Sequence, residues 1–262
     1  MASIMDGERK FHIQTLPGEV GEYVILPGDP GRVPKIAALL ENAVPVACNR
    51  EYNVYTGTLE GHKVSVCSTG IGGPSAAIAV EELIQCGAHT LIRVGTSGGM
   101  DLSVTGGDLI IASAAVRGEG TSHEYLPPEY PATADFEVIQ ALQQAAEKLS
   151  TDELGNGYHI GVVHSKDSFY GEVEPEKSPM SQDIQRRWDA YMRCGCLTSE
   201  MECAAVFSVG LARRARCGAV LTALWNVERS KAGLPDRITY DSSRAIACAV
   251  EAIRILIRQQ NA

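Results

Sequence analysis

Short apolar runs alternate with longer stretches of helical periodicity along the chain. The runs that predict buried strands are residues 22–27, 89–94, 107–117 and 217–227, and residues 158–170 begin as another. The stretches that predict helices are residues 32–40, 74–87, 134–149, 181–195, 201–215 and 241–259, and residues 52–70 predict a hairpin. This alternation predicts an α/β fold with a mixed, mostly parallel central sheet surrounded by helices. Ligands of such sheets bind beyond the carboxyl ends of the strands.

One of these ends carries an arginine and a glycine-rich turn. The segment RVGTSGG (93–99) places Arg93 near the end of a strand that we expect to stop at Gly95. The small residues from Thr96 onward let backbone N–H groups approach a ligand. A planar guanidinium can donate two hydrogen bonds to one oxyanion. The segment is typical of an anion site, although an ordinary strand-to-loop turn has the same composition.

Two further glycine-rich turns follow predicted strands. Residues 26–33 contain Gly28 and bring Arg32 to the start of a helix, where backbone N–H groups also face an anion. Residues 68–75 form the third turn, which lacks the spacing of a P-loop and of a dinucleotide-binding fingerprint. Three such turns after three strands predict one shared oxyanion pocket more strongly than any one of them does.

Composition narrows the class of protein. The chain has 262 residues, of which 45% are apolar, enough for one large domain or two small ones. We find no membrane span and no apolar signal region at the N-terminus, so we expect a cytoplasmic protein. The net charge of −9 argues against nucleic acid as the main partner. The eight cysteines form no C-x-x-C pair and are expected to be reduced core residues rather than disulfides or metal ligands.

The segment SEMECAAV (199–206) carries two carboxylates before an apolar helix. Glu200 and Glu202 either complement the dipole at the start of that helix or accept hydrogen bonds from a polyol such as ribose.

Eight segments, in order along the chain, resemble motifs of one family. They are FH (11–12), PGDPGRV (27–33), REY (50–52), CSTGIGGPSAAIAVEEL (67–83), RVGTSG (93–98), PATADFE (131–137), DSFY (167–170) and EMECA (200–204). The chain resembles the hexameric nucleoside phosphorylases, and among them most closely those that act on uridine. The resemblance implies one phosphorylase domain over 1–262, phosphate-dependent cleavage of a nucleoside to free base and (deoxy)ribose 1-phosphate, and no cofactor besides inorganic phosphate as co-substrate. It also implies a homodimer or a trimer of dimers with shared active sites.

The resemblance assigns roles to individual residues. Those implied to bind phosphate are Gly28, Arg32, Arg50, Arg93 and Thr96, with Arg50 reaching the phosphate of an adjacent subunit. Those implied to hold ribose are His12, Met201 and Glu202, with His12 crossing a dimer interface to the 5′-hydroxyl. Arg32, Arg93 and Glu202 are thereby expected to carry the catalysis, through positioning and electrostatics. In some members a monovalent cation such as K⁺ lies between subunits near the glutamate that corresponds to Glu51.

The base-binding residues depart from the uridine pattern. Phe169 corresponds to an aromatic residue that packs near the base, but the Gln-x-Arg that follows in uridine phosphorylases is replaced by GEVEPEK (171–177). Later in the chain, Asn226 matches the family, and the nearest arginine is Arg229. Asn226 and Arg229 are therefore candidates for contacts to the base, although a loop arginine of this kind is more often solvated.

Several alternatives stay open at this point. A carboxylate-rich base pocket also suits a purine ring, so purine nucleoside phosphorolysis is the second choice after uridine or a related pyrimidine nucleoside. A catalytically silent nucleoside-binding protein is the alternative from another class. A hydrolytic nucleosidase would not need Arg32, Arg50 and Arg93, and is disfavoured for that reason.

Overall fold

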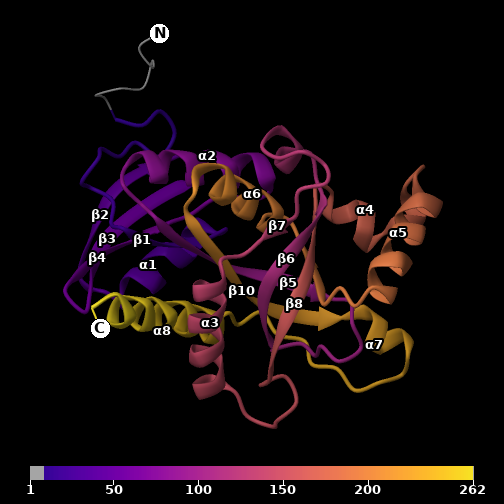
Figure 1. The fold of residues 1–262 in the computed structure, drawn as a ribbon. Coiled ribbons are helices and arrows are strands. Elements are labelled where there is room, and N and C mark those ends of the chain that lie inside the picture. The colour runs from indigo at the N-terminus through magenta and orange to yellow at the C-terminus, as the bar shows by residue number, and fades with distance from the viewer. Residues whose placement is uncertain (1–8, 262) are drawn as a thin grey trace.

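The structure, a computed structural model, describes residues 9–261 and follows the predicted alternation of strands and helices (Figure 1). Its strands are β1 (Tyr23–Pro27), β2 (Glu41–Asn49), β3 (Tyr52–Leu59), β4 (His62–Cys67), β5 (Thr90–Gly99), β6 (Leu109–Gly118), β7 (Ala132–Thr133), β8 (Tyr158–Lys166), β9 (Thr198–Glu200) and β10 (Arg216–Asn226). Its α-helices are α1 (Val33–Ala37), α2 (Gly73–Gln85), α3 (Phe136–Leu149), α4 (Phe169–Val173), α5 (Ser181–Arg193), α6 (Cys203–Arg213), α7 (Val227–Lys231) and α8 (Ser243–Gln260). Single 3₁₀ turns are η1 (Pro30–Arg32), η2 (Thr121–Glu124) and η3 (Pro175–Lys177).

Strand β5 is the centre of the ten-stranded sheet. It pairs in parallel with β1 on one edge and with β10 on the other. From β10 the pairing runs through β6, β8 and β9, and β9 returns to the end of β5, so these strands close into a ring. On the other side β1 pairs with β4, and β4, β3 and β2 continue as an antiparallel meander. The predicted fold, a mixed and mostly parallel sheet with surrounding helices, is confirmed.

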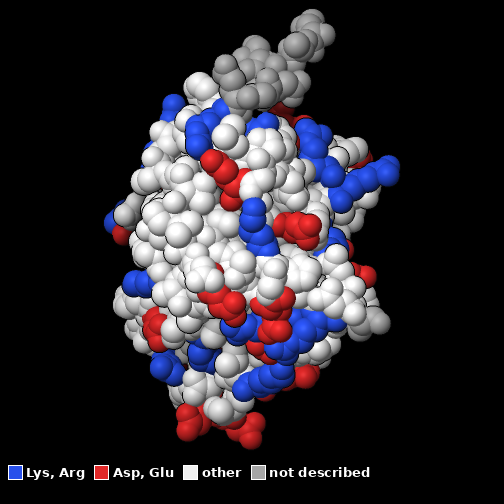
Figure 2. All heavy atoms as spheres, turned by 90° about the vertical axis from the view of Figure 1, so that its left-hand side faces the viewer, with Lys and Arg blue, Asp and Glu red and all other residues white. Residues whose placement is uncertain are grey.

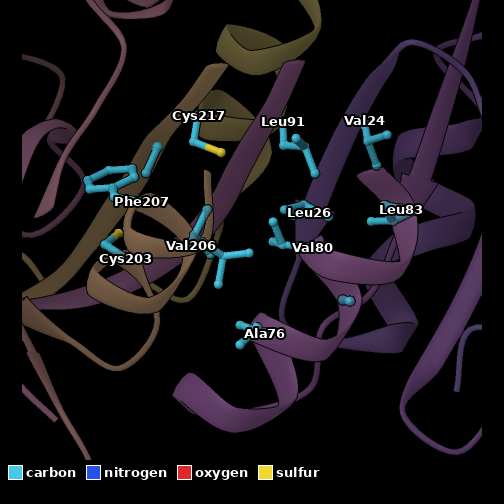
Figure 3. Close-up of a cluster of buried hydrophobic side chains, with 14 of the residues drawn as sticks. Val24, Leu26, Ala76, Val80, Leu83, Leu91, Cys203, Val206, Phe207 and Cys217 are labelled. Atoms are coloured by element: carbon cyan, nitrogen blue, oxygen red, sulfur yellow. The ribbon is translucent and has the colours of Figure 1, made fainter. Parts of the chain in front are cut away.

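Two apolar layers cover the two faces of the sheet. In the first, α2 and α6 pack on β1, β5 and β10; Figure 3 shows Val80 of α2 beside Leu26, Leu83 of α2 near Val24, and Phe207 of α6 on the side of Cys217 of β10. In the second, α1, α3 and α8 cover the opposite face. A fully buried leucine or phenylalanine side chain stabilises the fold by about 1.5–3 kcal/mol, so these layers hold the strand ends in fixed positions.

Some boundaries differ from the sequence-based predictions. Strand β5 does not stop at Gly95 but continues to Gly99, because β10 pairs with it and β9 takes up its last residues, Gly98 and Gly99. The prediction missed β2, whose exposure follows no regular alternation, and the very short β7 and β9. The expected helix at 32–40 is a 3₁₀ turn followed by the short α1.

All eight cysteines are free, which confirms the absence of disulfides, and six of them are buried as predicted. Cys48 and Cys194 are exposed instead. Within residues 9–261 no helix is long and apolar enough to cross a membrane. On the side of β2, β3 and β4, Figure 2 shows basic and acidic side chains interspersed around a broad uncharged area.

Candidate active site

A pocket of about 1130 Å³ opens where β1 and β5 end, as expected for this kind of sheet. The turns after β1 and β4 and the end of β5 line one part of it, and the end of β9 lines another. Helices α4, α5 and α7, which stand beside the closed ring in Figure 1, contribute the remainder. The pocket contains the predicted residues Gly28, Arg32, Glu51, Arg93, Thr96, Phe169, Met201 and Glu202.

Arg32 contributes a cation to this pocket. Its guanidinium is half-buried at the end of η1, and no residue in the described chain accepts a hydrogen bond from it or forms an ion pair with it. Burial lowers the pKa of Arg32, with only a partial offset from nearby Asp29. A desolvated guanidinium that has no protein partner and faces a pocket is suited to an anionic ligand.

Arg93 presents further hydrogen-bond donors to the turn that contains Gly28. A Cβ atom on Gly28 would lie 4.0 Å from Nη1 of Arg93 and 3.2 Å from the carbonyl oxygen of Gly70. Nη1 donates no hydrogen bond within residues 9–261. The absence of a side chain at Gly28 therefore leaves open a space that Nη1 of Arg93 faces.

The other side of the Arg93 guanidinium is occupied by two carboxylates. Its Nη2 lies 2.5 Å from Oε2 of Glu202 and 3.1 Å from Oε2 of Glu200, and its Nε donates to Glu200 at 3.1 Å. All three side chains are almost fully buried. Glu200 also accepts hydrogen bonds from Ser165 Oγ and from the backbone N–H groups of Glu202 and Cys203.

The pKa values of the two carboxylates are shifted in opposite directions. Burial opposes the ionisation of Glu200, but Arg93 and the hydrogen bonds from Ser165 and the backbone outweigh it and lower its pKa. Burial raises the pKa of Glu202, and the charge of Glu200 adds to this effect against the opposing charge of Arg93. Glu200, whose charged form is favoured, is thus the counter-ion that anchors Arg93, whereas burial disfavours the charged form of Glu202. Glu200 also lies at the start of α6, because it accepts the N–H group of Cys203, the first residue of that helix.

The far end of the pocket is largely aromatic and apolar. Phe169 starts α4 and stands edge-on to Tyr170. Trp188 of α5 and Trp225 of β10 also line this end, and Trp188 Nε1 donates to Glu228 of α7 at 3.1 Å. Such walls suit a flat heterocyclic ring.

The structure does not bring Asn226 and Arg229 into the pocket, contrary to the expectation that they contact the base. Asn226 is fully buried; its Oδ1 accepts the N–H groups of Glu228 and Arg229 as the N-cap of α7, and its Nδ2 donates to backbone carbonyls of Asp101 and Val104. The guanidinium of Arg229 donates to the carbonyls of Leu102 and Pro235. Both side chains hold the α7 segment in place.

His12 and Arg50 also lie outside the pocket. His12 is held by Glu82, which accepts hydrogen bonds from the His12 backbone and lies 2.6 Å from its Nδ1. The carbonyl of His12 accepts a hydrogen bond from Asn49 at 2.8 Å, so His12 lies beside the β2–β3 turn that carries the exposed Arg50. Glu51, next in that turn, does line the pocket and accepts a hydrogen bond from Ser75.

The sequence analysis missed several polar residues of the pocket. Ser97 is buried there, and its hydroxyl has no hydrogen-bond partner in the part of the chain that the structure describes. Lys166 and Ser199 come from the ends of β8 and β9 and contact Glu172 of α4. A charged residue at the end of an apolar strand, as in VVHSK (162–166), was the available signal, since Arg93 follows the same pattern.

Comparisons with known proteins agree with this site. The model of the phosphorylase superfamily matches residues 22–254. The uridine phosphorylase of Treponema pallidum is 48% identical over 261 residues, which cover 100% of this chain and 99% of the relative. The uridine phosphorylase of Thermococcus kodakarensis is 44% identical over 94% of this chain and 86% of its own length. The guanosine phosphorylase of Halorubrum lacusprofundi is 37% identical over 94% of this chain and 98% of its own length. The resemblance found in the sequence is confirmed: the chain belongs to the phosphorylase superfamily.

Proposed function

We propose that the protein is a pentosyltransferase that cleaves uridine with inorganic phosphate, giving uracil and ribose 1-phosphate, and that residues 1–262 act as one phosphorylase domain. The observation that carries this proposal is the arrangement of Arg32, Arg93 and Glu202 in one pocket. Two sets of unused cationic donors face the glycine-rich turn, and a carboxylate lies directly beside them. A phosphate and a sugar hydroxyl would therefore bind side by side.

In the reaction, phosphate binds between Arg32 and Nη1 of Arg93, with the backbone near Gly28 and Thr96 as further donors. One of its oxygens attacks C1′ of the ribose while the bond from C1′ to the base nitrogen breaks, and the electron pair leaves with the base. The phosphate charge stabilises the positive charge that develops on the sugar. Glu202 and Met201 hold the ribose, so catalysis depends on positioning and electrostatics, and no cofactor is required.

A guanosine-cleaving enzyme is the second candidate. It is supported by the similarity to the Halorubrum relative and by the size of the pocket, which also accommodates a purine. Uridine is preferred because the two relatives at 44% and 48% identity are both named uridine phosphorylases. Arg32, unpaired within residues 9–261, argues against a hydrolase, since water needs no anion site.

The proposal includes assembly into dimers, and into trimers of dimers, in the cytoplasm. His12 and Arg50 lie side by side and away from their own pocket, which is the placement expected if both complete the site of a neighbouring subunit. A K⁺ ion at Glu51 depends on the same contact. One carboxylate supplies too few oxygens for such a cation, and a second copy of the chain would supply others.

Product analysis tests the function. The purified protein is incubated with uridine, thymidine, inosine or guanosine, with and without phosphate, and free base, ribose and ribose 1-phosphate are quantified. Uracil and ribose 1-phosphate that form only with phosphate would support the proposal. Cleavage of inosine or guanosine but not of uridine would support the purine alternative. No cleavage of any nucleoside would favour a nucleoside-binding protein.

A further inference from the structure

Four polar side chains form a cluster at the base end of the pocket: the buried His164 and Lys166 of β8 and Ser199 of β9, and the partly buried Glu172 of α4. Lys166 Nζ donates to Ser199 Oγ at 2.5 Å and lies 3.1 Å from Oε2 of Glu172. Ser199 Oγ donates to the same Oε2 at 2.7 Å, and His164 Nδ1 lies 3.0 Å from Oε1. Lys166, Glu172 and Ser199 line the pocket.

The cluster has hydrogen-bonding capacity left over. An ammonium has three protons, and Lys166 uses two of them, on Ser199 and Glu172. A carboxylate offers about four lone-pair sites; Lys166 and Ser199 occupy two on Oε2, and the contact with His164 Nδ1 takes up at most one on Oε1. One proton on Lys166 Nζ and at least one lone pair on Oε1 of Glu172 therefore remain at the wall of the pocket, and Nζ lies 3.1 Å from the other oxygen of that carboxylate, Oε2. An unused donor and acceptor this deeply buried are costly unless a ligand completes them.

The spacing fits one chemical group. In a lactam, the carbonyl oxygen and the neighbouring N–H nitrogen are about 2.2 Å apart, from the bond lengths of an amide. Such a group can accept from Lys166 and donate to Glu172 at the same time. Uracil, thymine, hypoxanthine and guanine present this edge. Cytosine and adenine present the reverse, an amino group beside a ring nitrogen with a lone pair, which would place donor against donor and acceptor against acceptor.

We propose that Lys166 and Glu172 read the base, with Lys166 donating to the carbonyl oxygen and Glu172 accepting from the adjacent N–H. Because Met201 and Glu202 hold the ribose, the orientation of the base is fixed. The base cannot turn over to place its N–H group against Lys166 and its carbonyl oxygen against Glu172. Lys166 also stabilises the negative charge that reaches this oxygen when the base leaves. The inference rests on the proposed phosphorolysis, and it narrows the substrates to nucleosides of oxo-pyrimidines and 6-oxopurines. It thereby supplies the base-reading contacts that the missing Gln-x-Arg leaves open.

The first test compares substrates on the unaltered protein. With saturating phosphate, kcat/KM is measured for uridine and inosine and for the amino analogues cytidine and adenosine. The proposal expects the oxo nucleoside of each pair to react at least about 100-fold faster, since the wrong edge leaves two buried groups unpaired. Equal rates, or faster cleavage of cytidine or adenosine, would overturn it.

The second test uses Lys166→Met and Glu172→Gln, with Lys177→Met and Glu174→Gln as matched controls. Lys177 and Glu174 form an exposed ion pair in the same segment but do not line the pocket. Loss of one charge-assisted hydrogen bond corresponds to about a 10- to 100-fold drop in kcat/KM for uridine in Lys166→Met. Glu172→Gln should raise the cytidine-to-uridine ratio of kcat/KM by about 10-fold, because an amide can also donate. If the two residues had a merely structural role, their replacement would lower kcat/KM for all substrates together and leave the cytidine-to-uridine ratio unchanged.

The outcomes separate this inference from the proposed function. If the unaltered protein releases no base with phosphate, phosphorolysis itself fails. If it releases base but both pocket variants keep the ratios of the controls, only the base-reading role of Lys166 and Glu172 is wrong. Should Lys166→Met not fold, the cytidine-to-uridine ratio of Glu172→Gln against its control Glu174→Gln still tests the base-reading role.

Discussion

Replacing Arg93 by methionine removes the charge that pairs directly with two buried carboxylates of the site. Methionine fills much of the volume of the arginine stem, so the change acts mainly on charge. Glu200 keeps hydrogen bonds from Ser165 and from two backbone N–H groups, whereas Glu202 keeps the N–H of Gly72. Most of the penalty therefore falls on Glu202.

Breaking a buried ion pair by removing one partner costs about 3–5 kcal/mol, and we expect a loss of this size near neutral pH. The loss should depend on pH. Without Arg93 the pKa of Glu202 rises further above its value in the unfolded chain, so the folded variant binds more protons than the unfolded one between these two pKa values. Its stability then falls as pH rises through this window and recovers as pH falls, by up to about 1.4 kcal/mol per pH unit for one proton.

The assay is urea denaturation of Arg93→Met and of the unaltered protein between about pH 5 and pH 8, at one protein concentration because assembly also shifts the midpoint. The matched control is Arg117→Met. Within residues 9–261 the Arg117 guanidinium donates only to backbone carbonyls and to Ser122 Oγ, so its replacement should lower the free energy of unfolding by the same amount at each pH. A cost below about 1 kcal/mol for Arg93→Met, or one that does not shrink toward acid, would refute the view that Glu202 is left as an uncompensated buried charge.

Three further predictions concern the site and its neighbours. Arg50→Ala should raise the KM for phosphate by about 10-fold through loss of one charge-assisted contact across subunits, and unchanged phosphate kinetics would count against a shared site. Glu202→Ala should lower kcat by about 100-fold while the far-ultraviolet circular dichroism stays that of the folded protein, and an unaltered rate would remove Glu202 from the mechanism. Burial opposes the ionisation of Glu172, but His164, Lys166 and Ser199 lower its pKa from 4.5 to about 2. Its charged form therefore contributes on the order of 3 kcal/mol above pH 4.5 that is lost as pH falls toward 2; an acid unfolding curve of Glu172→Gln that matches the unaltered protein would contradict this.

The sequence predicted well that the glycine-rich turns with Arg32 and Arg93 meet in one pocket, because local signals determine their placement. Gly28, Arg32, Arg93 and Thr96 follow strands of a predicted parallel sheet, and the ends of such strands meet at one edge. The strand boundary at Gly95 was wrong because pairing with β9 is a long-range contact that leaves no periodic pattern in a run of glycines.

The base end was predicted poorly, for two different physical reasons. Asn226 followed by VER is the signature of a helix N-cap with an acidic residue in the first turn, and this local role takes precedence over a ligand contact. Lys166 and Glu172 meet only because α4 folds back over the ends of β8 and β9. Spacing along the chain does not reveal that contact.

The most direct test of phosphorolysis follows the oxygen that becomes bonded to C1′. Uridine is incubated with the protein and phosphate labelled with ¹⁸O at every position, and the sugar product is analysed by mass spectrometry. The account predicts ribose 1-phosphate that retains every labelled oxygen, including the one that bridges to C1′. Free ribose carrying an oxygen from water would show hydrolysis and contradict the role of Arg32 and Arg93 as the site that holds the attacking phosphate.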